Sequence, residues 1–477
     1  MLRNLIGSEW RLPNEDSGSL PVYNPATGEV IEHVPLSDAS EVDAAARAAA
    51  EAFRTWSRTP VMERVRLMFR YKAVLEDHFE ELAAIVTRHH GKTLDESRGE
   101  VRRGIEVVDF ACGAPTLLQG RTLRDVSTGV DQDLYRYPVG VCAGIPPFNF
   151  PVMIPLWMFP LAVVAGNTFV LKPSERTPLG GARLGELFLD AGFPPGVLNV
   201  VHGAATTVDA LLSHPSVAAI SFVGSATVAR HVYTEAAAHG KRVQALGGAK
   251  NHIVVMPDAD LELAVPAILN SAFGNAGERC LAGSVAVAVG RAADSVVEPL
   301  RDGASRMVVG PGDEQGVQVG PLIRAEHRDR VASYVEAGVA EGAELIVDGR
   351  PQMSRRGFFL GPTILDRVTP SMSVGREEIF GPVLSISRAA TLEEAIAQAN
   401  ASALGNMATI FTQSGRSGRE FRERVEAGMT GINVPVAQPF AFFPFSGWKG
   451  SFYGDLHVHG TDGIDFYTRK KVVVTRW

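Results

Sequence analysis

The first quarter of the chain alternates apolar and polar positions with a helical period. After Asp38 and Glu41, which resemble a capping box, apolar residues recur three or four positions apart up to Trp56. The pattern predicts helices from Asp38 onward, over 61–79 and over 95–118. Residues 121–138 are more polar and predict a hairpin that turns at Thr128 and Gly129.

From residue 140 onward, short apolar runs alternate with helical stretches. The predicted strands cover 141–144, 168–172, 197–201, 219–223 and 241–245, with helices over 179–191 and 227–238. A second block runs from 252 to about 443, with strands predicted over 252–256, 285–289, 384–388, 408–412 and 431–434, and the tail over 465–474 is predicted as a further strand. Such alternation is typical of an α/β fold with a doubly wound parallel sheet.

The chain is too long for one hydrophobic core, because it has 477 residues. We expect two α/β domains, one from 1–120 with 139–251 and one from 252–443. A small β element from 121–138 with 444–477 completes the predicted division.

Composition excludes several classes of protein. A net charge of −7 argues against nucleic-acid binding, which needs a basic excess. Three cysteines cannot build a disulfide framework, the N-terminus has no secretory apolar core, and no uncharged run reaches the roughly 20 residues of a membrane helix. We therefore expect a cytoplasmic protein without membrane contact.

Cys280 is the strongest candidate for chemistry, within FGNAGERCLAGS. A helix that ends at the glycine-rich segment leaves the sulfur at a backbone turn. There, backbone N–H groups and Arg279 are expected to favour the reactive thiolate. The alternative on this segment alone is a buried structural cysteine.

Two further loops carry polar candidates at the ends of predicted strands. Prolines around Asn149 fix the backbone, which would orient its amide for an oxyanion hole, although asparagine is also a common turn residue. Lys172 and Glu175 of KPSE suit a ribose diol, and the helix beginning at Ser225 suits a pyrophosphate. Each is weak alone: KPSE also fits a solvated loop, and G-x-G-x-x-G is absent.

Taken together, PFNFP, KPSE, FVGS, LGGAKN, FGNAGERC and EEIFGPV resemble the aldehyde dehydrogenase superfamily in order and spacing over nearly the whole chain. The resemblance implies a Rossmann-type NAD domain (1–120 and 139–251), a catalytic domain (252–443) and an oligomerisation element of a homotetramer. It implies that Cys280 attacks an aldehyde while Asn149 steadies the oxyanion. It also implies that NAD is bound by Phe148, Lys172, Glu175, Arg176, Ser225, Gly247, Glu378 and Phe380.

One departure from that family bears on the acyl acceptor. Most hydrolytic members carry a glutamate before Leu-Gly-Gly, where it activates water, and this chain has Ala245. Loss of a general base costs about 10²–10⁴-fold in rate. A thiol with a pKa of about 8.5 needs less help, which points to coenzyme A as the cosubstrate.

This variant resembles the CoA-acylating methylmalonate-semialdehyde dehydrogenase branch, as do RRGIEVVDFA, GERC and the tail from 445 to 471. The branch implies that Arg103 and Arg279 clamp the acid end of malonate or methylmalonate semialdehyde, giving acetyl-CoA or propanoyl-CoA with loss of CO2. For Arg103 the alternative is a solvated helix face. For Arg279 it is tuning of Cys280.

Two other functions stay open at this point. A hydrolytic dehydrogenase would recruit Glu378 or Glu278 as the base, and a silent protein of the same fold would have no activity. We expect Cys112 and Cys142 to be core thiols, Trp157 and residues 442–445 to form the pocket wall, and no metal, since the histidines lack ligand spacing. The pair His457 and His459 is predicted to share one face of a surface strand.

Overall fold

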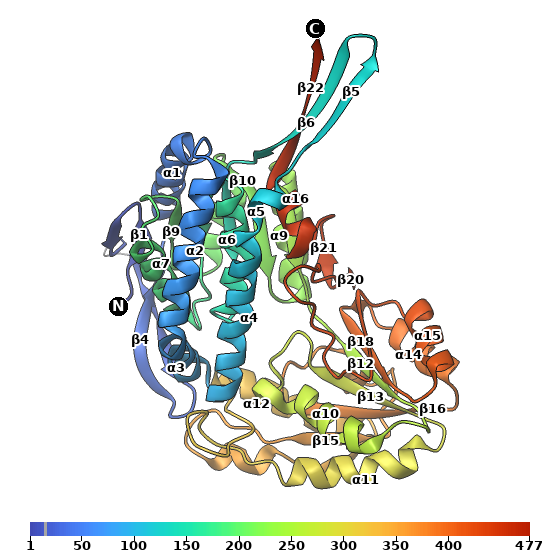
Figure 1. Cartoon of the computed structure of the whole chain (residues 1–477). Helices are drawn as coiled ribbons and strands as arrows, with labels where there is room; N and C mark the ends of the chain where they lie inside the picture. The colour runs from blue at the N-terminus through green and yellow to red at the C-terminus, as the bar shows by residue number, and fades with distance from the viewer. Residues whose placement is uncertain (14–16) are drawn as a thin grey trace.

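The computed structural model describes residues 1–13 and 17–477, which form two large sheets flanked by helices and a projecting arm (Figure 1). The first sheet has eight strands in the order β2-β1-β9-β8-β7-β10-β11-β21. Their bounds are β1 Asn4–Ile6, β2 Glu9–Arg11, β7 Val141–Ile145, β8 Thr168–Leu171, β9 Leu198–Val200, β10 Val217–Val223, β11 Arg242–Leu246 and β21 Phe452–Tyr453. The five central strands are parallel and the edge strands pair antiparallel.

Helices cover both faces of this sheet, which is the doubly wound arrangement. They are α1 Ala39–Trp56, α2 Val61–Asp77, α3 Phe79–His90, α4 Leu94–Cys112, α5 Ala114–Leu117, α6 Met153–Val164, α7 Pro178–Asp190, α8 Ala205–Ser213 and α9 Ala226–Ala238. Gly104 lets α4 approach α6 closely, since a Cβ there would lie 2.7 Å from a methyl group of Leu156. This close packing fixes the part of α4 that carries Arg103.

The second sheet has seven strands in the order β14-β15-β16-β13-β12-β18-β19. They are β12 Asn251–Val255, β13 Gly283–Val289, β14 Glu344–Val347, β15 Thr363–Asp366, β16 Val383–Ala389, β18 Met407–Phe411 and β19 Met429–Ile432. All neighbours are parallel except β14 and β15. Its helices are α10 Leu261–Phe273, α11 Ala292–Ser305, α12 Ala325–Ala340, α13 Ser373–Arg376, α14 Leu392–Asn400 and α15 Gly415–Arg424.

The chain passes from one sheet to the other through only four residues, 247–250, between β11 and β12. The carboxyl ends of the parallel strands in the first sheet therefore lie towards the amino ends of β12, β13, β16 and β18. Ligands of open α/β sheets bind beyond the carboxyl ends of the strands. The segments that precede β13 and β16 carry Cys280 and Glu378, so the topology brings both groups of candidate residues to one region.

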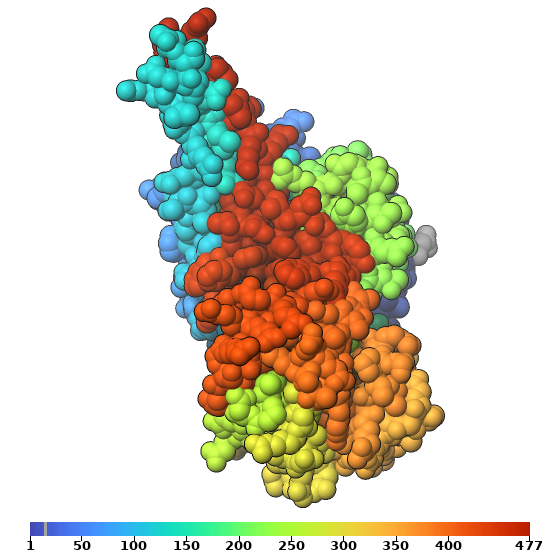
Figure 2. All heavy atoms as spheres, turned by 90° about the vertical axis from the view of Figure 1, so that its right-hand side faces the viewer, coloured from blue at the N-terminus to red at the C-terminus, as the bar shows by residue number. Residues whose placement is uncertain are grey.

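An arm of three antiparallel strands extends from the body of the molecule (Figures 1 and 2). It consists of β5 Arg121–Ser127, β6 Val130–Pro138 and β22 Thr468–Arg476, in the order β22-β6-β5. The remaining elements are the hairpin of β3 Ser19–Asn24 and β4 Glu29–Pro35, the pair β17 Leu404–Gly405 and β20 Trp448–Lys449, and α16 Gly460–Phe466.

The predicted fold class is confirmed, and each strand predicted between 141 and 434 is present within two residues at each end. Three predictions were wrong. The helix predicted over 95–118 is two helices, α4 and α5, and the tail strand begins at Thr468 because α16 occupies residues 460–466. His459 does not lie on a surface strand, since it is buried with φ 72 and its ring contacts Trp157 at 4.4 Å.

The predicted domain boundaries stay a prediction. β21, which falls within the expected oligomerisation element, joins the edge of the first sheet. In the part of the chain that the structure describes, no helix is both long and apolar enough to cross a membrane.

Candidate active site

The segment before Cys280 is a strained turn. Helix α10 ends at Phe273, and within the 3-10 helix Gly274–Gly277 that follows, Asn275 and Ala276 adopt left-handed φ angles of 55° and 50°. Gly277 also has a positive φ, and a Cβ there would collide with the carbonyl of Gly381. The prediction that a helix ends before Cys280 and leaves it at a backbone turn is confirmed. Such strain persists only where the surroundings enforce it.

The thiol of Cys280 is not activated in this structure. Burial raises its pKa to about 12, and the charge of Glu378 adds to the rise. The backbone N–H groups of Cys280 and Leu281, and to a lesser extent Arg279, lower the pKa, but burial exceeds their effect. The expectation that Arg279 and the backbone N–H groups favour the thiolate is therefore confirmed in direction, although burial outweighs them.

Two buried asparagines hold the backbone of the nucleophile. The side-chain amides of Asn251 and Asn406 donate to the carbonyl oxygen of Cys280 at 2.9 and 2.8 Å. Asn251 also donates to the carbonyl of Ala282 at 2.8 Å. Neither residue was predicted as a site component, although Asn251 belongs to the LGGAKN motif. Each directly precedes or opens a strand of the second sheet, and that position was the available signal.

Asn149 is buried and fixed from two sides. Its Nδ2 donates to the carbonyl of Glu278 at 2.9 Å, and Lys92 Nζ donates to its backbone oxygen at 2.6 Å. Lys92 is itself buried and paired with Glu100 at 2.6 Å. The amide is thus oriented beside the Cys280 segment rather than exposed in a turn. Its role at the oxyanion stays a prediction.

Cys280 opens onto a cavity of about 300 Å³. Arg103, Arg279, Trp157 and Phe445 line it. The predicted pocket wall was partly wrong, because Phe442 and Phe443 are exposed. Arg103 is held by an ion pair with Glu106 at 2.8 Å and lies over the ring of Phe440, 4.5 Å from its centroid.

Arg279, which directly precedes Cys280 in the sequence, lines the same cavity as Arg103 on α4. Its Nη2 donates to Glu96 Oε1 at 2.8 Å. The two arginines of the predicted clamp therefore border one space with Cys280, which a solvated helix face would not require. Their contact with a carboxylate stays a prediction.

Five of the predicted cofactor residues form two groups, and the members of each group contact one another. Lys172 Nζ donates to Glu175 Oε2 at 3.0 Å directly after β8. Burial raises the pKa of Glu175, but the charge and hydrogen bond of Lys172, a backbone hydrogen bond and the charge of Arg176 together outweigh it, and the net pKa is lowered. In the second group, Phe148 packs edge-on against Phe380 with centroids 5.9 Å apart, and Arg176 lies over Phe148 at 5.2 Å.

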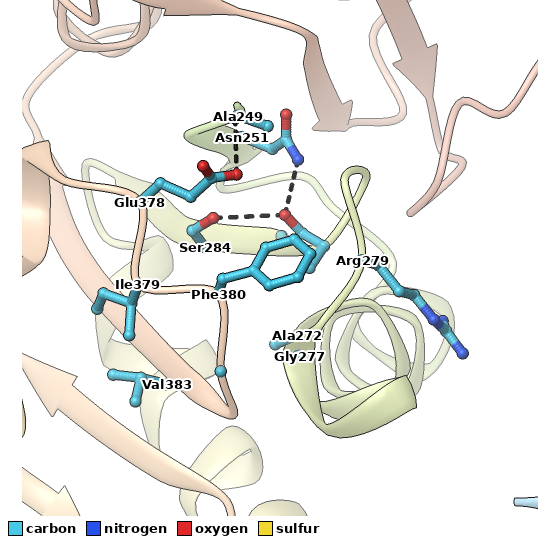
Figure 3. Close-up of a pocket in the computed structure, with 13 residues that line it drawn as sticks. Ala249, Asn251, Ala272, Gly277, Arg279, Ser284, Glu378, Ile379, Phe380 and Val383 are labelled. Carbon is cyan, nitrogen blue, oxygen red and sulfur yellow. Dashed lines mark hydrogen bonds between the residues drawn. The ribbon is translucent and has the colours of Figure 1, made fainter. Parts of the chain in front are cut away.

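Glu378 lies with Phe380 along a second, small cavity that Arg279 also borders (Figure 3). Its Oε1 accepts from the backbone N–H of Ala249 at 2.8 Å, and burial raises its pKa to about 7. Figure 3 shows the guanidinium of Arg279 directed away from Glu378 and Phe380. Arg279 thus borders both cavities, and its guanidinium is directed away from the residues of the smaller one.

Ser225 and Gly247 follow the neighbouring strands β10 and β11. Ser225 caps α9, since its Oγ accepts from the N–H of Val228 at 3.4 Å. A Cβ at Gly247 would lie 2.7 Å from the carbonyl of Gly450, so a close approach of two backbones accounts for this glycine.

Glu278 and Glu378 are the candidate bases for activating water. Neither is among the residues that line the cavity of Cys280, and each accepts a backbone hydrogen bond. Glu278 is fully buried, accepts from Ile323 N at 3.3 Å and lies 3.3 Å from His327 Nε2. Burial raises its pKa to about 8. Ala245 is fully buried between Phe222 and Tyr453 of the adjacent strands.

The remaining candidates are structural. Cys112 and Cys142 are buried free thiols, as predicted. Residues 1–13 and 17–477 contain no group of three or more His, Cys, Asp or Glu side chains arranged to hold a metal ion.

Comparison with known proteins agrees with this geometry. The model of the aldehyde dehydrogenase family matches residues 10–473. Malonate-semialdehyde dehydrogenase 2 of Geobacillus kaustophilus is 57% identical over 100% of this chain and 99% of its own. The crystal structure of methylmalonate-semialdehyde dehydrogenase from Oceanimonas doudoroffii is 47% identical, with a TM-score of 0.98 over 100% of this chain and 98% of that one.

A Sinorhizobium meliloti structure assigned to methylmalonate-semialdehyde dehydrogenase and solved with NAD is 43% identical, again with a TM-score of 0.98, and covers 100% of this chain and 98% of that one. A match over nearly all of the chain identifies the family and the fold. The chain belongs to the aldehyde dehydrogenase family.

Proposed function

We propose that the protein is an NAD-dependent, CoA-acylating dehydrogenase of malonate or methylmalonate semialdehyde. The observation that carries the proposal is the common cavity of Cys280, Arg103 and Arg279. A guanidinium binds a carboxylate through two parallel hydrogen bonds, so two arginines beside a nucleophile suit an aldehyde with an acid end. The names of the relatives point to the same substrates.

The residues at the strand ends fit NAD. The Lys172–Glu175 pair offers a carboxylate and an ammonium for a ribose diol, and a carboxylate there disfavours a 2′-phosphate. The amino terminus of α9, capped by Ser225, offers backbone N–H groups for a pyrophosphate. Glu378 and Phe380 border the small cavity next to the nucleophile segment and would hold the nicotinamide end. When bound, NAD supplies the hydride acceptor that turns the thiohemiacetal on Cys280 into a thioester.

The chain's own residues carry the acyl-transfer chemistry. The Cys280 sulfur bonds to the aldehyde carbon, and Asn149 Nδ2 together with the Cys280 backbone N–H would hold the oxyanion. In the second half-reaction the CoA thiolate adds to the thioester carbonyl and Cys280 leaves as its thiolate. CO2 is lost from the acid end after acylation, so malonate semialdehyde yields acetyl-CoA and methylmalonate semialdehyde yields propanoyl-CoA.

Coenzyme A is favoured over water because the carboxylates near Cys280 already have partners. Glu100 accepts from Lys92 and from the N–H groups of Val152 and Met153, and Glu96 binds Arg279. Ala245 has no group that takes a proton. A positioned general base contributes about 10²–10⁴-fold, so hydrolysis of the thioester is expected to be slow.

The test follows NADH from purified enzyme, NAD and malonate semialdehyde, with and without CoA. A single-turnover burst without CoA that becomes steady turnover on its addition, with acetyl-CoA as product, supports the proposal. Steady turnover to a free acid without CoA would overturn the acylating assignment and favour a hydrolytic dehydrogenase.

We also infer that the arm joins copies of this chain in a homotetramer. Leu123, Val472 and Val474 on the arm are 64%, 60% and 59% exposed, and Trp477 at its tip is 86% exposed. Apolar side chains gathered on a projecting sheet mark an interaction surface. A cytoplasmic location is likewise inferred, since Cys112, Cys142 and Cys280 are all unpaired.

A further inference from the structure

Glu96 joins three parts of the site through one carboxylate. At the first turn of α4, its Oε2 accepts from the N–H of Thr93 at 3.0 Å and completes a capping box. Its Oε1 accepts from the N–H of Asn275 at 2.6 Å and from Arg279 Nη2 at 2.8 Å. The side chains of Glu96 and Arg279 are 17% and 20% exposed, and both line the cavity of Cys280. Helix α4, the strained turn and the arginine are thus held at one point.

The guanidinium of Arg279 is fixed from a second side by Gly274. A Cβ at position 274 would lie 2.7 Å from both Nη1 and Nη2, so the guanidinium packs directly on the glycine backbone. Nη2 is committed to Glu96, and Arg279 as a whole lines the cavity of Cys280. A side chain as long as arginine otherwise loses rotamer freedom on binding a ligand.

We propose that Glu96 is a positioning residue for the substrate carboxylate, which acts by holding Arg279 in its binding orientation before the semialdehyde arrives. The inference rests on the proposed function, because it assumes that Arg279 contacts the acid end. Pre-organisation of this kind favours substrates with a carboxylate and leaves the chemistry at the aldehyde unaffected. Glu96 also carries a negative charge, which would repel the same carboxylate if its charge were not neutralised by Arg279 and two backbone N–H groups.

The test compares malonate semialdehyde with propanal, an aldehyde of three carbons without the acid end. Glu96→Gln removes the acceptor for Thr93 and the negative charge that faces Arg279, so Arg279 is held at most by a neutral acceptor and more weakly. The expected result is a rise of about tenfold in KM for malonate semialdehyde, the scale of one lost charge-assisted hydrogen bond, with KM for propanal unchanged within about twofold. Asp95→Asn is the matched control: it removes the same charge from the same helical turn, but Asp95 is 92% exposed and pairs with Arg98.

Two further variants separate positioning from a general effect on folding. Gly274→Ala keeps an allowed backbone, since φ is −57°, but displaces the guanidinium, and it is expected to raise the same KM selectively. In an Arg279→Gln background, Glu96→Gln is expected to add nothing, because the residue acts through Arg279.

The outcomes are distinguishable from failure of the proposed function. A fall in KM for malonate semialdehyde in Glu96→Gln, an equal change for both aldehydes, or full additivity with Arg279→Gln would overturn the role of Glu96. If Arg279→Gln itself does not discriminate between the two aldehydes, the clamp is wrong and the inference falls with it. If Arg279→Gln discriminates and Glu96→Gln does not, only the inference falls.

Discussion

The pKa of Cys280 makes the reactivity of the ligand-free protein predictable. With a pKa of about 12, only about one thiol in ten thousand is ionised at pH 8. Iodoacetamide reacts with the thiolate, so its second-order rate constant with Cys280 should rise about tenfold for each pH unit from 7 to 10, without a plateau. A plateau between pH 8 and 9 would show that the site stabilises the thiolate and that burial does not keep the pKa of Cys280 high.

The Glu378→Gln variant tests the second cause of the shift. Burial raises the pKa of Glu378 to about 7, so this carboxyl is mostly neutral at pH 6 and charged at pH 9. Its charge raises the pKa of Cys280, and removing it should lower that pKa by about half to one unit. The variant should therefore alkylate about three to ten times faster than the native protein at pH 9 and at the same rate at pH 6.

The assay is the loss of dehydrogenase activity with time in iodoacetamide, with peptide mass mapping to confirm the alkylated residue. Mapping is needed because Cys112 is also free, although burial raises its pKa to about 12. Glu377→Gln is the control, since Glu377 is exposed, accepts from Tyr334 and carries the same charge. A rate ratio that does not change with pH, or an equal effect of the control, would show that the charge of Glu378 does not act on Cys280.

Three other variants test Asn149, Glu278 and the arm. Asn149→Ala should slow the NADH burst about 10²–10³-fold, the usual effect of one oxyanion donor, and a burst within tenfold of the native rate would remove Asn149 from that role. Because burial raises the pKa of Glu278 from 4.5 to about 8, the folded state binds more protons than the unfolded state between these values, and stability is lost as pH rises through them. Denaturant unfolding at pH 5 and 8 should show the native protein losing roughly 3–5 kcal/mol relative to Glu278→Gln, and parallel curves for the two proteins would contradict the shift. The double variant Val472→Asp with Val474→Asp should dissociate the proposed tetramer in light scattering, while an unchanged mass would show that the arm does not mediate assembly.

The strands were predictable because their information is local. β7 and β12 are buried along their whole length, and a short apolar run between helical stretches is the signal of such a strand. The prediction for the tail was wrong because the local pattern there is too short to read. Residues 460–466 form a single short helix before β22, and a helix of two turns leaves no period long enough to identify.

The residues that hold Asn149 and Cys280 in place were not predictable from the spacing of motifs in the sequence. Lys92 reaches Asn149, 57 positions away, and Asn406 reaches Cys280, 126 positions away. Motif order predicted the candidate nucleophile and the strand-end residues, which lie beside strands of two regular sheets. The supporting contacts depend on how the two sheets approach each other, which no local pattern records.

Burial accounts for the raised pKa of the Cys280 thiol and also bears on the acyl acceptor. A guanidinium within reach of a sulfur lowers its pKa only as far as its charge is not already neutralised, and Arg279 is paired with Glu96. Burial of Cys280 disfavours any charge there, the thiolate included, and Glu96 and Glu100 are both occupied by other donors. Among the described residues that line the cavity of Cys280, the carboxylates Glu96 and Glu100 are thus both paired with other donors. Since a thiol with a pKa of about 8.5 is a few per cent ionised near neutrality, the proposed acyl acceptor, coenzyme A, would bring its own nucleophile for the second half-reaction.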